Sequence, residues 1–80
     1  MIRDKRSYLK FHLELAMKAC NKVVTSYKTT TVDKEYAAYI GKCSRDVYLS
    51  LDNYSDIELD FIIDNLRKIM KPIKSNSNAI

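Results

Sequence analysis

The spacing of apolar residues along the chain predicts three amphipathic helices. Between about residues 4 and 27, apolar residues recur at alternating steps of four and three, which places them on one helix face. A second set of residues lies next to these positions and widens the apolar face on one side. Because so wide an apolar arc usually has two neighbours, we expect this helix to contact two other helices, or one helix and another protein. The face comprises Leu9, Leu13, Ala16, Cys20, Val23 and Tyr27, and the second set comprises Tyr8, Phe11, His12, Leu15 and Ala19.

A second helix is predicted over about residues 32–52. The consecutive threonines before it are poor helix formers, and Thr31 is expected to cap the helix N-terminus. Asp52-Asn53 is expected to end it, because Asn tolerates the backbone conformation that follows a helix. Its apolar positions are Tyr36, Ile40, Cys43, Val47 and Leu51.

The start of the third helix, predicted over about residues 55–71, is the most clearly marked point in the chain. Ser55 and Glu58 have the spacing of a capping box, in which each side chain binds a backbone N–H of the first turn. Pro72 is expected to stop the helix, which leaves 74–80 as a flexible polar tail. The apolar face consists of Leu59, Ile62, Ile63, Leu66, Ile69, Met70 and Ile73.

These elements predict an all-α fold, an antiparallel three-helix bundle with residues 1–73 as a single helical domain. The short connection between the first two helices makes them antiparallel neighbours. When the apolar faces of the two helices are aligned, each apolar residue of the first helix lies at the same level along the hairpin as an apolar residue of the second helix or of the segment after it. The pairs are Tyr27 with Tyr36, Val23 with Ile40, Cys20 with Cys43, Ala16 with Val47, Leu13 with Leu51, and Leu9 with Tyr54.

The net charge of +4 is concentrated in the first helix, because residues 1–28 contain seven Lys or Arg and only two acids. A basic helix can meet nucleic acid, an anionic membrane surface or an acidic protein, or can simply remain solvated. The basic N-terminus is not followed by an uninterrupted apolar segment, so no secretory signal is expected. No apolar run is long enough to span a bilayer. We therefore expect a cytoplasmic protein.

The residue types that carry catalysis or bind metals are sparse. Cys20 and Cys43 are expected to face each other, either as a redox pair or, as we favour, as packed reduced thiols. His12 lies at the border of the apolar arc without a nucleophile motif. Asp60 and Asp64 are explained by the helix dipole. We therefore expect a non-enzymatic protein with no cofactor, no metal and no catalytic residue.

Small residues and tyrosines suggest contact surfaces. Gly41, with Ala37 and Ser44 nearly stacked beside it, would let another backbone approach the second helix, either the third helix or a partner. Tyr39 and Tyr48 fall off the apolar face of the second helix. They either pack against the third helix or belong to an interface, where tyrosine is common.

The segment Leu59–Ile73 resembles a helix of small bacteriocin immunity proteins of Gram-positive bacteria. The similar features are apolar residues before the Leu66-Arg67-Lys68 step and a proline that stops the helix. The resemblance implies a helical bundle that protects a producer cell from its own membrane-active peptide, acting at the cytosolic side of a membrane sugar transporter. The chain departs from the pattern in having only Lys74 to Ile80 after this helix, so no functional residue is carried over.

These observations favour a cytoplasmic module that binds another protein. The most specific partner we expect is a membrane transporter subunit, which the protein would bind at the periphery of the membrane. The contact residues we expect are Arg67, Lys68, Lys71, Lys74, Tyr39 and Tyr48. One alternative is a small nucleic-acid-associated or transcription-modulating protein that uses Arg3, Lys5, Arg6, Lys10, Lys18 and Lys22. Another is a homodimeric chaperone or structural subunit, if the first helix is not covered within one chain.

Overall fold

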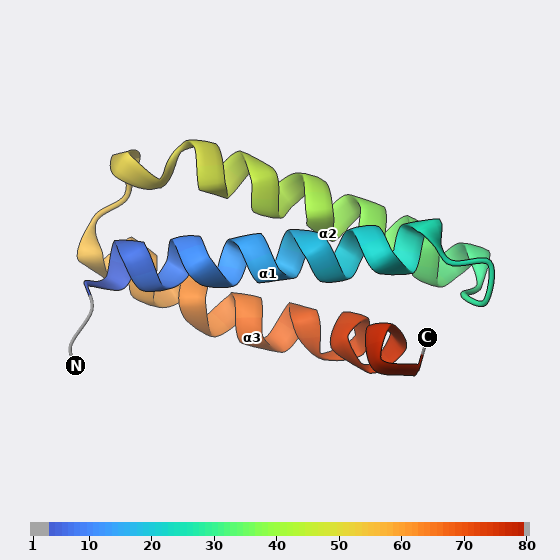
Figure 1. The fold of residues 1–80 in the computed structure, drawn as a ribbon. Coiled ribbons are helices and arrows are strands. Elements are labelled where there is room, and N and C mark those ends of the chain that lie inside the picture. Colours follow the sequence, from blue (N-terminus) through green and yellow to red (C-terminus); the bar gives the residue numbers. More distant parts are fainter. Residues whose placement is uncertain (1–3, 80) are drawn as a thin grey trace.

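The computed structural model describes the backbone of residues 4–79 and the side chains of residues 4–76. Its elements are α1 (Lys5–Thr25), α2 (Thr31–Leu49), the short 3-10 helix η1 (Leu51–Asn53) and α3 (Asp56–Ala79). The helices run up, down and up, so that α2 is antiparallel to its neighbours and α1 and α3 run parallel (Figure 1). The prediction of an all-α three-helix bundle is confirmed.

The helix starts follow local capping chemistry. Asp4 caps α1, where its carboxylate accepts a hydrogen bond from the Ser7 backbone N–H at 2.9 Å. At α3 the capping box is confirmed, since the Ser55 N–H donates to Glu58 Oε1 at 3.0 Å and the Glu58 N–H donates to Ser55 Oγ at 3.3 Å. At α2 the predicted cap is wrong by one residue, because Thr30, not Thr31, accepts the capping bond.

The predicted helix ends are wrong in three places. α1 ends at Thr25 rather than near residue 27, and α2 ends at Leu49, after which the chain tightens into η1. The largest error is at α3, which continues through Pro72 to Ala79 instead of stopping near residue 71. The predicted tail over 74–80 is therefore helical as far as Ala79, and Ile80 lies outside the described residues.

Tertiary packing explains why Pro72 does not end α3. Proline inside a helix removes one backbone hydrogen bond and strains the preceding turn. Here the Pro72 ring lies on the exposed face, while the next residue, Ile73, is 1% exposed and continues the core face of Leu66 and Met70. Burial of an isoleucine contributes about 1.5–3 kcal/mol, which is of the same size as the penalty for an internal proline.

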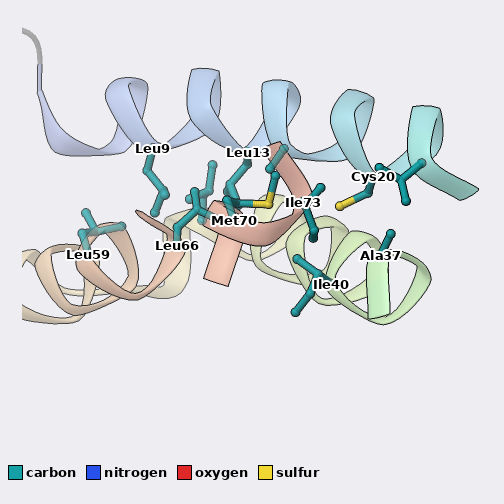
Figure 2. Packing of buried hydrophobic residues seen from close by; sticks show 12 residues of the cluster. Leu9, Leu13, Cys20, Ala37, Ile40, Leu59, Leu66, Met70 and Ile73 are labelled. Atoms are coloured by element: carbon teal, nitrogen blue, oxygen red, sulfur yellow. The ribbon is translucent and has the colours of Figure 1, made fainter. Parts of the chain in front are cut away.

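The core runs between the three helices, with α1 in contact with both neighbours and α2 and α3 meeting less closely (Figure 2). The prediction that α1 has two helical neighbours is therefore confirmed. The largest fully buried side chains are Leu9, Leu13, Val23, Leu59 and Ile73.

Gly41 lies where α1 and α2 approach most closely. A Cβ placed on Gly41 would lie 3.3 Å from the Cys20 Cβ, so the close neighbour is α1, not α3 or a partner. In the hairpin, Cys20 lies opposite Gly41 and not opposite Cys43, the partner predicted for it. Cys43 is about half a helical turn from Gly41 along α2. The predicted pairing of Tyr27 with Tyr36 does not form part of the core, because α1 has ended and Tyr27 is 88% exposed.

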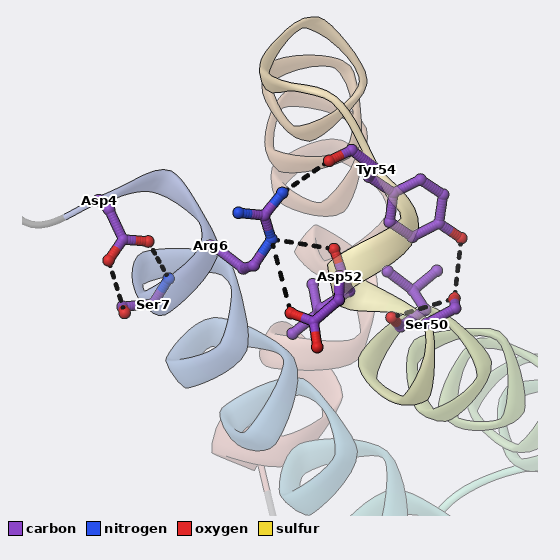
Figure 3. A network of polar contacts seen from close by, with 8 residues as sticks. Asp4, Arg6, Ser7, Ser50, Asp52 and Tyr54 are labelled. Atoms are coloured by element: carbon purple, nitrogen blue, oxygen red, sulfur yellow. Dashed lines mark hydrogen bonds and ion pairs between the residues drawn. The ribbon is translucent and has the colours of Figure 1, made fainter.

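Arg6, near the start of α1, forms hydrogen bonds with the connection between α2 and α3 (Figure 3). Its guanidinium donates from Nε to the Leu51 carbonyl at 3.1 Å and from Nη2 to the Tyr54 carbonyl at 2.6 Å. Asp52 adds an ion pair at 3.9 Å, although its side chain is almost fully exposed. The two carbonyls, which lie at η1 and just before α3, thereby gain a charged donor.

Candidate functional site

A groove with a volume of about 170 Å³ lies between α1 and α3. Its floor is apolar and includes the buried Leu9 and Leu66. Polar and charged groups lie only on its walls. The complete lining is Tyr8, Leu9, His12, Leu15, Ala16, Ile63, Leu66, Arg67, Met70 and Lys74.

The groove follows from two helix faces that run in parallel. On α1, Tyr8, His12 and Leu15 recur at steps of four and three, so they share the flank that faces α3. On α3, Arg67 and Lys74 are two turns apart and share the opposite wall. Near the N-terminal ends of these two helices, the Lys5 ammonium group of α1 forms an ion pair with the Asp60 carboxylate of α3 at 2.9 Å.

Two aromatic rings, those of Tyr8 and His12, contribute to the α1 wall. The rings of Tyr8 and His12 lie 4.3 Å apart between centroids, and Phe11 meets His12 edge to face at 5.5 Å. Arg67 Nη2 donates a hydrogen bond across the groove to the Tyr8 hydroxyl at 3.1 Å. Phe11 and Leu15 are 55% and 44% exposed, so apolar surface continues from the groove onto the outside of α1.

The groove is electropositive. Partial burial lowers the pKa of His12 below its usual value, and the nearby Lys74 and Arg67 charges lower it further. His12 is therefore held in its neutral form at neutral pH, and Arg67 and Lys74 supply the positive charge. None of the lining residues is acidic, so an anion near this groove would be attracted without repulsion from its walls.

The structure brings together only part of the contact set predicted from the sequence. Arg67 and Lys74 line the groove, and Lys71 is exposed on the same helix. Lys68 pairs with Asp64 of α3 at 3.3 Å. The two predicted tyrosines of α2 do not line the groove: Tyr39 is 65% exposed, and Tyr48 donates to Glu14 Oε1 at 3.1 Å.

The predicted nucleic-acid set is spread over α1. Lys5 pairs with Asp60 of α3, whereas Lys10 lies 5.8 Å from the centre of the Tyr48 ring on α2. Arg6 is occupied by the backbone carbonyls described above. Arg3 lies outside the described residues, and the exposed Lys18 and Lys22 follow further along α1. Among the described members, Lys5, Arg6 and Lys10 are therefore engaged in contacts within the bundle.

The groove was not evident from sequence reasoning. Tyr8, His12 and Leu15 were recognisable as an extension of the apolar arc, which was the available signal. The position of α3 beside them was not, because the apolar pattern of each helix does not decide which flank of α1 the third helix covers.

Other chemistry is limited within the described part of the chain. Cys20 and Cys43 are free thiols, and burial raises the pKa of Cys20 to about 11, which makes this thiol a poor nucleophile. Residues 4–76 hold no group of three His, Cys, Asp or Glu side chains placed to bind a metal ion. None of the helices over the described residues combines the length and the hydropathy that crossing a membrane requires.

Comparison with protein-family models, curated proteins and solved structures finds no match to this chain. The functional inference therefore depends on the chemistry of the groove between α1 and α3. That chemistry combines an apolar floor, the Tyr8 and His12 rings on the α1 wall and two cations, Arg67 and Lys74, on the α3 wall.

Proposed function

We propose that this protein is a non-enzymatic binding module that holds another protein against the groove between α1 and α3. The observation that carries the proposal is the continuity of the groove floor with the exposed side chains of Phe11 and Leu15. Apolar pockets beside exposed aromatic residues are where interfaces gain most of their affinity. Arg67 and Lys74 would then orient the partner through charged hydrogen bonds.

The most specific form of this proposal is bacteriocin immunity. The protein would protect its producer by binding at the cytosolic face of a membrane transporter. Two observations support this form: the helical fold agrees with the family that Leu59–Ile73 resembles, and Arg67 belongs to that segment and lines the groove. One feature of the resemblance, a helix that stops at its proline, is not present, because α3 continues through Pro72 to Ala79. The groove would supply the contact surface without requiring any chemical step.

Capture of the partner tests the general proposal. The tagged protein is incubated with nuclease-treated, detergent-solubilised lysate, and the retained proteins are identified by mass spectrometry. Leu15→Lys places a charge at the groove edge and should abolish retention of the partner. Lys42→Glu changes the charge of an exposed residue on α2 and serves as the control. Equal retention of the partner by both variants, or the absence of any retained protein after nuclease treatment, would contradict the proposal.

A protection assay tests the specific form. A sensitive Gram-positive strain that expresses the chain is challenged with a panel of peptide bacteriocins. Immunity requires survival against at least one peptide, with survival lost in Leu15→Lys and kept in Lys42→Glu. If the strain that expresses the wild-type chain remains sensitive to every peptide while the captured partner is still bound, the immunity form is wrong and the binding module stands.

A further inference from the structure

The parallel arrangement of α1 and α3 gathers positive charge at one end of the bundle. Residues 15–25 of α1 contain two lysines and no acid, and residues 65–76 of α3 contain four Lys or Arg and no acid. Because the two helices run in the same direction, these segments lie side by side near the α1–α2 loop (Figure 1). The acids of α3, namely Asp56, Glu58, Asp60 and Asp64, all precede this region.

The two cations of the groove are available to a ligand. Arg67 donates to Tyr8 through one nitrogen, which leaves further guanidinium donors free. Neither Arg67 nor Lys74 forms an ion pair with another described residue. Lys71 lies between them in the sequence and is also exposed. A ligand with carboxylates would therefore find two charged donors beside an apolar floor, with Asp64 as the described acid whose charge acts on Arg67.

The walls of the groove are long enough to follow a helix laid along them for two to three turns. Its α1 wall, from Tyr8 to Ala16, extends about 12 Å at the helical rise per residue, and its α3 wall, from Ile63 to Lys74, extends about 16 Å. Arg67 and Lys74 are separated by about 10.5 Å along α3, which is two helical turns. The exposed pair Phe11 and Leu15 are one turn apart on α1, and Leu15 belongs to the groove lining.

We infer that the segment recognised by the groove is an acidic amphipathic helix of the partner protein. Its apolar residues, spaced three and four apart, lie on the floor between the helices. Two carboxylates on one flank, two turns apart, accept hydrogen bonds from Arg67 and Lys74. The inference rests on the proposed function, since it names the part of the partner that the binding module holds.

Synthetic helical peptides of about 14 residues, four turns, test the inference with the full chain. The matched peptide carries an apolar stripe and two glutamates two turns apart on its flank. The control peptide has the same composition, with the glutamates moved to the face opposite the apolar stripe. Fluorescence anisotropy should give tighter binding of the matched peptide, with an affinity that falls as salt increases, because the contacts are partly exposed ion pairs.

Charge removal on the protein provides the second comparison. Arg67→Gln and Lys74→Gln should each weaken the matched peptide by about three- to ten-fold, and Lys42→Gln should leave it unchanged. Circular dichroism confirms that each variant is folded. Equal binding of the two peptides would overturn the inference. So would an affinity for the matched peptide that neither Arg67→Gln nor Lys74→Gln changes.

Two other occupants give results that also overturn it. Binding to phosphatidylglycerol vesicles in place of the peptide would assign the groove to a membrane surface. Concentration-dependent sedimentation that is lost in Phe61→Ser would assign it to a second copy, whose α3 presents Ile57 and Phe61 among acids. If Leu15→Lys still abolishes partner capture while the acidic peptides do not bind, only this inference fails. If the acidic peptides do not bind and Leu15→Lys also leaves partner capture unchanged, the proposed function fails as well.

Discussion

Removal of the Arg6 guanidinium should destabilise the bundle without touching its apolar core. In Arg6→Met the long apolar stem is kept, and the hydrogen bonds to the Leu51 and Tyr54 carbonyls are lost. These two bonds fasten the α2–α3 connection to α1. The substitution therefore measures how much this one side chain contributes to holding the third helix in place.

The expected magnitude follows from the geometry. A hydrogen bond from a charged donor contributes about 1.5–3 kcal/mol when well protected. The Arg6 side chain is 39% exposed, so water replaces part of each bond, and about 1 kcal/mol for each bond is the appropriate value. The total of about 2 kcal/mol is substantial for an 80-residue domain, whose full stability is about 4–12 kcal/mol.

Urea denaturation followed by circular dichroism at 222 nm measures this change in the free energy of unfolding. The melting temperature should fall by about 8–16 °C. Asp52→Asn is the matched control, because its ion pair with Arg6 is long and its side chain is 99% exposed, so its loss should cost less than about 0.5 kcal/mol. A loss below about 0.5 kcal/mol in Arg6→Met, or an equal loss in Asp52→Asn, would refute the reasoning.

Three further predictions concern single side chains. Because the folded pKa of His12 is lowered, the unfolded chain binds the proton more readily, so stability is greatest above about pH 6.5 and decreases as the pH falls. Denaturation of His12→Gln between about pH 7.5 and pH 5 should show a smaller decrease, and an unchanged pH slope would exclude this role. At pH 8 a thiol reagent should label Cys43 before Cys20, because Cys20 is buried with a raised pKa; equal rates in the native protein would contradict this order. Ile73→Ala should cost about 2–5 kcal/mol, measured by thermal and urea denaturation, because the side chain is buried beyond Pro72. A cost below about 0.5 kcal/mol would mean that α3 is not packed after the proline.

The features that sequence reasoning predicted well are those decided by neighbouring residues. The capping box of Ser55 and Glu58 depends on groups within one helical turn, so its pattern is sufficient to place the start of α3. The alternation of apolar residues predicted the core face of α1 for the same reason. Helix ends were less predictable, because Pro72 is a local stop signal that the packing of Ile73 overrides.

The sequence by itself determined three amphipathic helices, their core faces and the antiparallel hairpin of the first two, because periodicity and capping act over a few residues. Only the tertiary structure decided which flank of α1 meets α3, with Tyr8 and Arg67 in contact and Lys74 on the same wall as Arg67. The physical reason is that each of these residues satisfies its own helix pattern in many possible arrangements. The groove and its charge exist only once packing of the whole chain selects one of them.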